Sequence, residues 1–161
     1  MTEQVLGVAE VRRRLEPEGI EVVELPADTS TAVLAARALG TSVPTIVKSL
    51  LFLADGSPVL VLLSGDQRLD ARGFARQLGV KKVRMATPEQ CIALSGYAVG
   101  GVPPVGHRQP LRTFFDRHLL DHQTVYAAAG AYNAIFGITP DRLLELTGAE
   151  ITDATSSVPQ T

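Results

Sequence analysis

The spacing of apolar residues changes along the chain, and each change predicts a new secondary-structure element. Val5, Val8 and Leu15 recur at helical spacing before Pro17, which predicts a first helix over residues 3–16. The same reasoning predicts strands over residues 20–25, 82–85, 111–115, 124–128 and 132–138, and further helices over residues 30–39, over residues 69–78, from Thr87 to Gly96 and from Thr139 to Gly148.

The middle of the chain holds the densest apolar run. Residues 45–53 and 58–63 are rich in Leu and Val and flank Asp55-Gly56, which is a strong signal for a β-hairpin. Both strands are apolar at nearly every position, so we expect other elements to cover the hairpin on both faces. Strands and helices in mixed order around this hairpin predict a mixed α/β (α+β) fold, with one curved, partly barrel-like mixed β-sheet flanked by helices.

The length of 161 residues suits one domain with its own core, and no repeat or linker interrupts it. We therefore expect a single domain over residues 1–161, with a frayed tail over residues 154–161. The apolar runs are too short to span a bilayer, and the first residues lack the order of a secretion signal. The single cysteine, Cys91, cannot form an internal disulfide. These features predict a cytoplasmic protein with no membrane partner.

The charge balance limits the nucleic acids that the chain could bind. Its formal net charge is -2, so it lacks the global basic field that long nucleic-acid grooves require, and DNA is not an expected partner. Basic residues do cluster locally, and a solvent-exposed charged face is the simpler interpretation. Any contact with RNA must therefore be local. The clustered residues are Arg12, Arg13, Arg14, Arg68, Arg72, Arg76, Lys81, Lys82 and Arg84.

Lys48 is the first candidate for chemistry, because Lys48 and Ser49 interrupt an otherwise apolar strand. A lysine is almost never fully buried without a partner. Lys48 could lie on an edge strand and point to solvent, where it would block edge-to-edge pairing. Alternatively, it faces a cleft and supplies a fixed positive charge to a phosphate or a polarised carbonyl.

The segment GYAVGGVPPVGH, residues 96–107, is the second candidate. Its glycines allow positive φ and the close approach of another molecule, whereas its two adjacent prolines stiffen the backbone and remove donors. The N–H groups of Gly100, Gly101 and Val102 would then form an uninterrupted run of donors for a carbonyl, an oxyanion or a ribose. A purely structural turn is the alternative, and the segment does not match the dinucleotide-binding fingerprint.

Conventional hydrolase motifs are present only as fragments. His118 and His122 are four residues apart, as zinc ligands can be, but the run HLLDH lacks the glutamate of the metalloprotease motif. Two Ser-Gly pairs offer only parts of the serine hydrolase motif, and Cys91 has the apolar neighbours of a packed thiol. We therefore expect no metal, no cofactor and no side-chain nucleophile.

Three further residues have the types and places expected beside a cleft. Asp116 ends an apolar strand and could anchor Lys48 or a loop, or could simply form a turn. Gly130, with Asn133 soon after it, would supply a second bare backbone turn beside a strand.

The segments that carry these residues resemble, in the same order, the YbaK-type aminoacyl-tRNA editing domains. These domains are freestanding relatives of the editing domain inserted in bacterial prolyl-tRNA synthetases. The resemblance covers about residues 15–153, and the lysine strand together with GGVPPVG is its most specific part. It implies a curved mixed sheet flanked by helices, and hydrolysis of amino acids wrongly esterified to tRNA. The segments are IVKSLLF, PVLVLLSGDQRLD, GYAVGGVPPVGH, TFFD and VYAAAGAYNAIFGITPDRLLELTGA.

The resemblance also implies roles for residues. Lys48 matches the functional lysine of the family, Gly100 and Gly101 its glycine loop, and Gly130 its second backbone turn. We accordingly expect Lys48, Gly100 and Gly101 to be catalytic. The residues expected to bind substrate are Ser49, Val102, Gly130, Asn133 and Asp116.

The partner implied is the 3′ acceptor end of an aminoacyl-tRNA, with an aminoacyl-tRNA synthetase as a further candidate. The tRNA would be tRNA-Pro or a related species carrying alanine, serine, threonine or cysteine. The form GGVPPVGH looks more like freestanding proofreaders of small or hydroxylated amino acids than like the bacterial cysteinyl-tRNA type. A protein that holds only the end of a tRNA needs only a local basic patch.

The chemistry implied fits a chain without an evident nucleophile. An aminoacyl ester is already activated, so positioning it against backbone donors, while water or the substrate's own ribose hydroxyl attacks, can suffice. Two alternatives stay open: a non-catalytic module that binds tRNA ends, nucleotides or a synthetase, and a metal hydrolase that uses His118 and His122.

Overall fold

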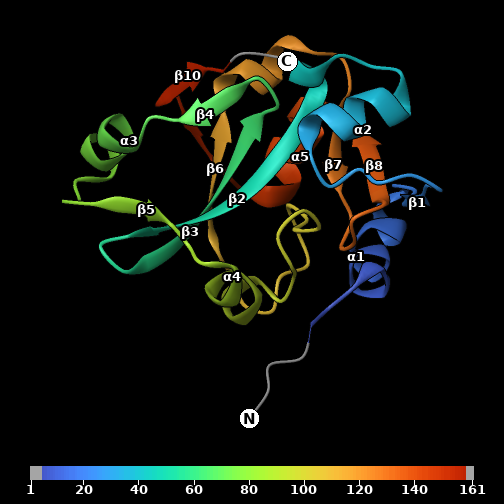
Figure 1. Ribbon diagram of the computed structural model, residues 1–161, viewed down its shortest axis with the longest axis horizontal. Coiled ribbons are helices and arrows are strands. Elements are labelled where there is room, and N and C mark those ends of the chain that lie inside the picture. Colours follow the sequence, from blue (N-terminus) through green and yellow to red (C-terminus); the bar gives the residue numbers. More distant parts are fainter. Residues whose placement is uncertain (1–4, 159–161) are drawn as a thin grey trace.

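The computed structural model describes residues 5–158, in which helices surround a mixed β-sheet (Figure 1). The mixed α/β fold expected from the sequence is confirmed. The helices are α1 (Val8–Leu15), α2 (Ala32–Leu39), α3 (Ala71–Leu78), α4 (Pro88–Ser95) and α5 (Pro140–Thr147), with short 3-10 helices at Glu16–Glu18, Val43–Thr45 and Arg117–Asp121. The strands are β1 (Val23–Glu24), β2 (Ile46–Ala54), β3 (Ser57–Ser64), β4 (Gln67–Leu69), β5 (Val83–Met85), β6 (Arg112–Asp116), β7 (Val125–Ala128), β8 (Ala134–Ile138), β9 (Glu150–Thr152) and β10 (Thr155–Ser157).

β2 lies at the centre of the sheet, whose strand order is β1-β8-β7-β2-β3-β6-β9. β3 pairs antiparallel with one edge of β2 from Val47 to Ala54. The other edge is shared, because β7 pairs in parallel with Ile46 and Val47 while β5 pairs antiparallel from Phe52 onward. Neither of these two ladders reaches residues 48–51. The sheet therefore has a gap beside the middle of β2.

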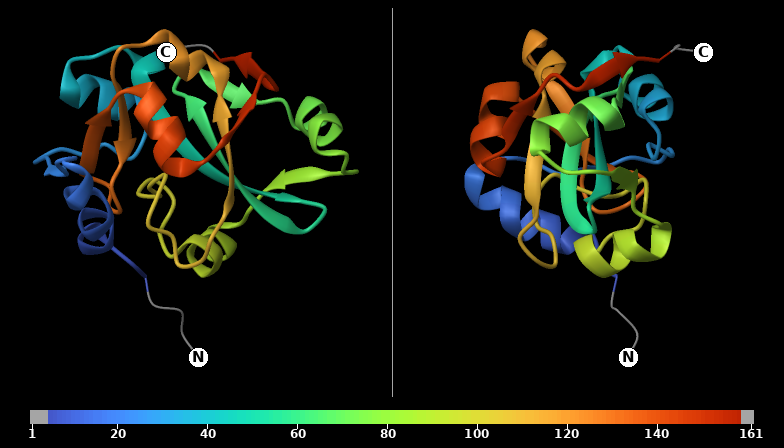
Figure 2. Two further views of the ribbon diagram at one scale, coloured as in Figure 1. Left: turned by 180° about the vertical axis from the view of Figure 1, so that it is seen from behind. Right: turned by 90° about the vertical axis from the view of Figure 1, so that its left-hand side faces the viewer.

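The hairpin of β2 and β3 forms as the sequence predicts. Asp55 and Gly56 both have positive φ, 46° and 86°, which is the conformation of the type I′ turns that match the twist of paired strands. Both faces of the hairpin are buried: Leu51 and Leu62 belong to the main core cluster, and Phe52 belongs to a second cluster around α3. In the side view of Figure 2, α1 and α5 lie on one face of the sheet and α2 on the opposite face.

The expected barrel character is only partial. The described pairings form an open path from β1 to β9, so strand pairing does not close a barrel within residues 5–158. The first helix is also shorter than expected, because it begins at Val8. Just before it, the N–H of Leu6 donates to the carbonyl oxygen of Gly96 at 2.6 Å, which holds the chain outside the helix. Residues 3 and 4 of the predicted helix lie outside the described residues.

The expectation of a frayed tail from residue 154 is wrong for residues 155–157. These residues form β10, which pairs antiparallel with β4 in a separate two-stranded sheet. The N–H of Asp70 also donates to the carbonyl oxygen of Ala154 at 2.8 Å. Residues 159–161 lie outside the described residues. Within the described part of the chain, no helix is both long enough and apolar enough to cross a membrane.

Candidate functional site

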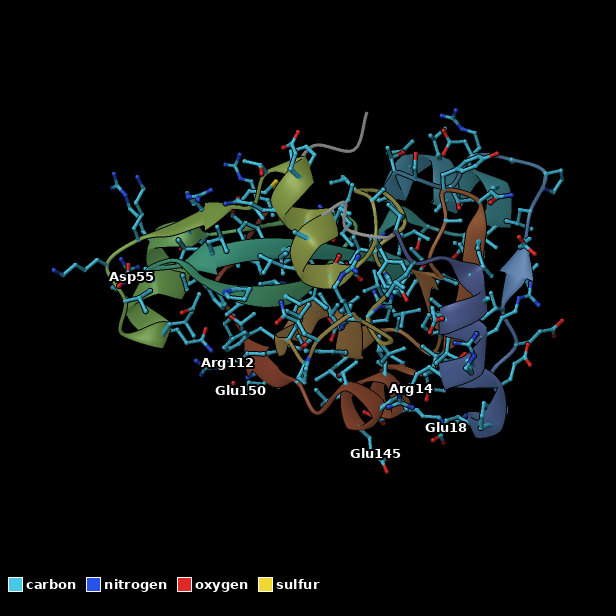
Figure 3. All side chains as sticks on the ribbon, turned by 90° about the horizontal axis from the view of Figure 1, so that it is seen from below. Arg14, Glu18, Asp55, Arg112, Glu145 and Glu150 are labelled. Atoms are coloured by element: carbon cyan, nitrogen blue, oxygen red, sulfur yellow. The ribbon has the colours of Figure 1, made fainter. Side chains whose placement is uncertain are left out.

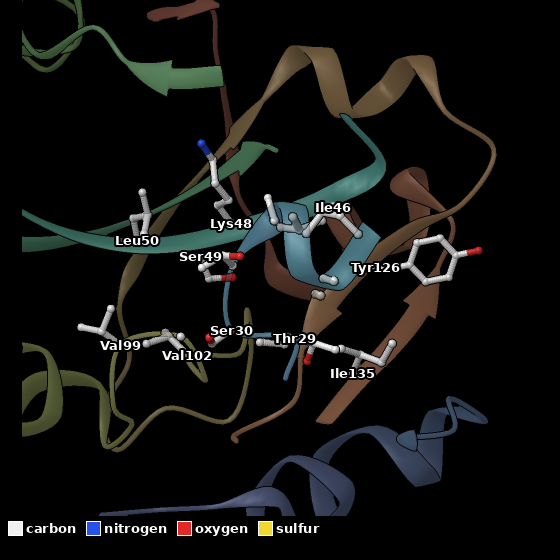
Figure 4. A pocket seen from close by; sticks show the side chains of 17 residues that line it. Thr29, Ser30, Ile46, Lys48, Ser49, Leu50, Val99, Val102, Tyr126 and Ile135 are labelled. Atoms are coloured by element: carbon white, nitrogen blue, oxygen red, sulfur yellow. The ribbon is translucent and has the colours of Figure 1, made fainter. Parts of the chain in front are cut away.

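A cavity of about 260 Å³ opens at the gap in the sheet beside the middle of β2 (Figure 4). Five parts of the fold line it: residues 29–32 at the start of α2, residues 46–50 of β2, the glycine loop around Gly100, β7 and β8. Of the eight residues expected in the site, the cavity lining includes Lys48, Ser49, Gly100 and Val102. The other four lie behind it or beside it.

Lys48 does not lie on an edge strand, because β2 is flanked by strands on both sides. Its Nζ atom donates to the carbonyl oxygen of Gln67, at the start of β4. Desolvation by burial lowers the pKa of Lys48, and the nearby carboxylates of Asp66 and Asp116 oppose this shift. In Figure 4 the amine points away from Ser49. The lysine is thus a half-buried cation at one rim of the cavity.

Ser49 points the opposite way, as successive side chains of a strand must (Figure 4). Its Oγ is buried and has no hydrogen-bond partner among the described residues. A buried hydroxyl without a partner costs about 1–3 kcal/mol. Such an atom in a cavity wall indicates a place where a ligand's polar group completes the hydrogen bonding.

The backbone of Ser49 also faces the gap. The carbonyl oxygen of Leu51 accepts from the N–H of Ala86 on this edge of β2 at 3.0 Å. Peptide groups of residues two apart in a strand point to the same edge, so those of Ser49 point there too. Because the β7 ladder ends at Val47 and the β5 ladder begins at Phe52, the N–H and C=O of Ser49 have no ladder partner on this edge.

The glycine loop offers two of the three expected donors. Gly100 and Val102 line the cavity, and neither N–H has a hydrogen-bond partner in the described part of the chain. The N–H of Gly101, by contrast, donates to the carbonyl oxygen of Ala98 at 3.0 Å. The prediction of three free donors in a row is therefore wrong, because the N–H of Gly101, the middle one, is used in the tight turn at residues 98–101.

Gly101 and Gly130 hold two loops together. The N–H of Gly130 donates to the carbonyl oxygen of Gly101 at 2.9 Å. A Cβ atom on Gly101 would lie 3.0 Å from the backbone nitrogen of Ala131, and one on Gly130 would lie 2.9 Å from the carbonyl of Gly7. Neither glycine lines the cavity. The absence of a side chain at these two positions lets the backbone segments behind the cavity wall pack closely.

Asp116 and Asn133 also have supporting contacts. The buried carboxylate of Asp116 accepts from the N–H of Ser64 at 2.9 Å and from His118, through its N–H at 3.0 Å and its Nδ1 at 2.8 Å. Asp116 thus anchors a loop, which was one of the expected alternatives, and affects Lys48 only through longer-range attraction. The Nδ2 of Asn133 donates to the carbonyl oxygen of Leu25 at 3.0 Å.

The segment of residues 96–107 is braced from within. The hydroxyl of the buried Tyr97 donates to the carbonyl oxygen of Gly106 at 2.6 Å. The Nε2 of His107 lies 2.7 Å from the carbonyl oxygen of Pro103. Burial lowers the pKa of His107, although the bond to Pro103 opposes the shift. The neutral imidazole with its proton on Nε2 is therefore the form that fits the loop.

Sequence reasoning missed the contribution of α2. Thr29 and Ser30 lie on the cavity floor opposite β2 (Figure 4), and a Cβ atom on Gly100 would lie 3.0 Å from the Cβ of Ser30. The run Asp-Thr-Ser-Thr in the sequence indicates a helix cap, and Thr31 does accept from the N–H of Leu34. Nothing in that local pattern indicates which distant loop lies against it.

The alternative chemistries have little geometric support. Among residues 5–158, no group of three or more His, Cys, Asp or Glu side chains could hold a metal ion. Cys91 is buried, its Sγ donates to the carbonyl oxygen of Tyr97 at 3.5 Å, and burial raises its pKa. A raised pKa disfavours the reactive thiolate, so Cys91 is a packed thiol.

Comparison with known proteins assigns this architecture to a family. Residues 26–146 match the family described as the aminoacyl-tRNA editing domain. A solved structure of a candidate trans-editing enzyme for prolyl tRNA synthetase superposes with a TM-score of 0.86 at 45% identity, covering 93% of this chain and 97% of the other.

Two curated relatives align over most of their lengths. The uncharacterized protein YwhH of Bacillus subtilis is 31% identical over 132 residues, which cover 81% of this chain and 83% of YwhH. The candidate Cys-tRNA(Pro)/Cys-tRNA(Cys) deacylase EbsC of Enterococcus faecalis is 27% identical over 130 residues, 80% of this chain and 79% of EbsC. The chain therefore belongs to the aminoacyl-tRNA editing domain family.

Proposed function

We propose that the protein is a trans-editing aminoacyl-tRNA deacylase, which hydrolyses the ester bond of a mischarged tRNA. One observation carries this proposal: unpartnered polar groups from β2 and from the glycine loop meet in one small, mostly apolar cavity. Preorganised donors in a cavity that excludes water are the means by which proteins stabilise the developing charge of acyl transfer. The family and the names of its relatives support the same chemistry.

In this proposal the ester carbonyl lies against the glycine loop. The N–H groups of Gly100 and Val102 donate to the carbonyl oxygen and to the oxyanion that it becomes. The adjacent prolines and the bonds of Tyr97 and His107 keep the loop rigid, so its donors need no rearrangement when charge develops.

Ser49 holds the amino-acid part of the substrate. Its C=O and Oγ are unpartnered acceptors on the cavity wall, and a protonated α-amino group carries three donors that need acceptors. A hydrogen bond to a charged group contributes about 1.5–3 kcal/mol. This assignment leaves the N–H of Ser49 for the ribose or for a water molecule.

Lys48 binds the nucleotide part of the substrate. Its ammonium lies at the rim beside β4, where it can meet the phosphate or ribose of the terminal nucleotide, and Asp66 and Asp116 favour its charged form. The attacking group that releases the amino acid is water, because attack by the neighbouring ribose hydroxyl would only move the ester from one ribose hydroxyl to the other. With water, its oxygen bonds to the carbonyl carbon, the carbon–oxygen bond to the ribose breaks, and the ribose oxygen takes up a proton.

The size of the cavity supports a small amino acid as the group removed. The apolar wall of the cavity includes Ile46, Tyr126, Ala127 and Ile135, and a volume of about 260 Å³ must hold the amino acid and part of a ribose. Alanine, serine, threonine and cysteine esters fit this limit, on tRNA-Pro or a related tRNA. Synthetases admit such small impostors because one methylene is worth only about 1–3 kcal/mol in a pocket. A synthetase that delivers the substrate and a cytoplasmic location are parts of the same proposal.

The test is deacylation of tRNA-Pro charged separately with alanine, serine, threonine and cysteine. The wild-type protein should release at least one of them, and Gly100→Ala should release it far more slowly. Gly100 has a φ of +93°, and the added Cβ would press on Ser30 in the cavity. Gly79→Ala is the matched control, since Gly79 has a φ of +70° with open space around its Cβ position.

One observation favours a second candidate, a non-catalytic module that binds tRNA ends. The amine of Lys48 is already bonded to Gln67 and points away from Ser49 (Figure 4), so the lysine contributes to binding more readily than to the reacting carbonyl. Tight binding of the tRNA end without release of any of the four amino acids would favour this candidate.

A further inference from the structure

The segment from β4 to β5 is strongly cationic in a chain of net negative charge. Residues 67–85 contain six of the chain's 15 Lys and Arg residues but only one of its 17 Asp and Glu residues. The six cations are all exposed, and we refer to them together as the cationic face. They are Arg68, Arg72, Arg76, Lys81, Lys82 and Arg84.

The carboxylates that the structure describes beside this face accept hydrogen bonds from backbone N–H groups and form no ion pair with its side chains. None of the six forms an ion pair with a described carboxylate, whereas five arginines elsewhere do. The carboxylate of Asp70 accepts from the N–H of Gly73 to cap α3, and that of Asp55 accepts from the backbone N–H groups of Lys81 and Lys82. The five paired arginines are Arg12, Arg13, Arg112, Arg117 and Arg142.

The cationic face adjoins the rim of the cavity at both of its ends. At one end, Lys48 donates to the carbonyl oxygen of Gln67, the residue before Arg68. At the other end, Arg84 pairs with Leu53 in the ladder of β5 with β2, and that ladder ends at Phe52, two residues from Leu50 in the cavity lining. Figure 1 shows α3, β4 and β5 together beside β2. A molecule in the cavity that extends past Lys48 would therefore reach this face.

We propose that the cationic face binds the phosphate backbone of the acceptor stem of the tRNA whose 3′ end occupies the cavity. This inference rests on the proposed function. RNA phosphates attract an array of exposed cations and release counterions on contact. Arg72 and Arg76 are one helical turn apart, about 6 Å along the axis of α3, a spacing similar to that of successive phosphates. The rest of the chain is net negative, so it repels RNA and favours this one orientation.

An exposed array of cations also protects an edge strand from pairing with other chains. β5 pairs only with β2 in the described sheet, so edge protection accounts for Lys81, Lys82 and Arg84. It does not account for Arg72 and Arg76, which lie on a helix. These two arginines are therefore the residues to test.

The experiment measures binding of an uncharged acceptor-stem RNA, a short hairpin ending in single-stranded CCA, over a series of salt concentrations. Arg72→Glu/Arg76→Glu should bind at least about tenfold more weakly than the wild type near 0.1 M salt, with a shallower dependence on salt, because contacts to phosphates are lost. Arg14→Glu is the matched control. Arg14 is also exposed on a helix, α1, far from Asp55 and the cationic face (Figure 3), so its reversal should change affinity by less than about twofold.

Two further measurements separate the explanations. Arg72→Gln/Arg76→Gln removes the charges without reversing them and should give an intermediate loss, and melting curves check that every variant folds. The rate of deacylation is also measured on full aminoacyl-tRNA and on an aminoacylated CCA trinucleotide, which lacks the acceptor stem. The ratio of the first rate to the second should be lower for Arg72→Glu/Arg76→Glu than for the wild type. RNA binding by that variant equal to the wild type would overturn the proposal. Failure of the proposed function is recognised separately, because the wild type would then release no amino acid from either substrate. The comparison of RNA binding by wild type and variant would still decide whether the cationic face binds RNA.

Discussion

The N–H of Gly130 donates to the carbonyl oxygen of Gly101 at 2.9 Å and so joins the two loops behind the cavity. Gly130 has a φ of +98°, and a Cβ atom there would lie 2.9 Å from the carbonyl of Gly7. We therefore predict that Gly130→Ala lowers the free energy of unfolding by about 2–4 kcal/mol, from left-handed strain and overpacking together. Denaturant unfolding measures this change.

The control for that prediction is Gly148→Ala. Gly148 has a φ of +62° but open space around its Cβ position, so this variant should lose only about 1–2 kcal/mol, from strain alone. Equal losses in the two variants would show that the contact with Gly7 is unimportant.

Ser49 gives a prediction in which stability and activity move apart. Its buried hydroxyl has no partner among the described residues, so Ser49→Ala should leave the free energy of unfolding unchanged or raise it by about 1 kcal/mol. Deacylation should fall by about tenfold or more, because a hydrogen bond to the substrate is lost. Denaturant unfolding and deacylation rates together check both parts.

Ser64→Ala is the matched control for Ser49→Ala. The hydroxyl of Ser64 donates its one hydrogen to the carbonyl oxygen of Pro44 at 2.6 Å, and the carboxylate of Asp66, 3.0 Å away, is the alternative acceptor. Its removal should lower the free energy of unfolding by about 1 kcal/mol or more. A destabilised Ser49→Ala variant with normal activity would mean that Ser49 has a structural partner and no substrate role.

The glycine loop should become less stable in acid because of His107. Burial lowers the pKa of His107 in the folded protein, whereas the unfolded chain has an ordinary pKa of about 6.5. The stability that neutral His107 contributes is therefore fully present above about pH 6.5 and is lost as the pH falls toward the folded-state pKa. The free energy of unfolding at about pH 8 and about pH 5.5 measures the loss, and His107→Gln should show less of it. Identical pH dependence in both proteins would contradict this account.

His118 should have the opposite pH dependence. Its hydrogen bond with Asp116 raises its pKa, so the stability it contributes is fully present below about pH 6.5 and is lost as the pH rises through the folded-state pKa. The difference in unfolding free energy between wild type and His118→Asn should therefore shrink from about pH 5.5 to about pH 8. A difference that grows over this range would mean that the pair with Asp116 does not form.

Local signals in the sequence predicted much of the fold. The Asp55-Gly56 turn and the capping box of Thr87 and Gln90 form as expected, because each depends on residues close in sequence. β4, β9 and β10 were not predicted. Each has only three residues, too few for periodicity, and each exists because a distant strand supplies its hydrogen bonds.

The sequence predicted only the part of the site that depends on residues close to one another in the chain. The charge of Lys48 in an apolar strand and the bare glycine loop are visible in the sequence, and both do line the cavity. The use of the N–H of Gly101 in a turn and the position of Ser30 depend on how the loop folds and on what packs against it. No local pattern contains that information.

The most direct measurement of the central claim compares wild type with Lys48→Ala on mischarged tRNA-Pro. We predict that the wild type releases a small amino acid. Lys48→Ala should have a kcat/KM about a hundredfold lower, which is about 3 kcal/mol lost with its contact to the terminal nucleotide, while it still unfolds cooperatively. A folded Lys48→Ala variant with near-wild-type deacylation, or a wild type that releases none of the four amino acids, would contradict the account.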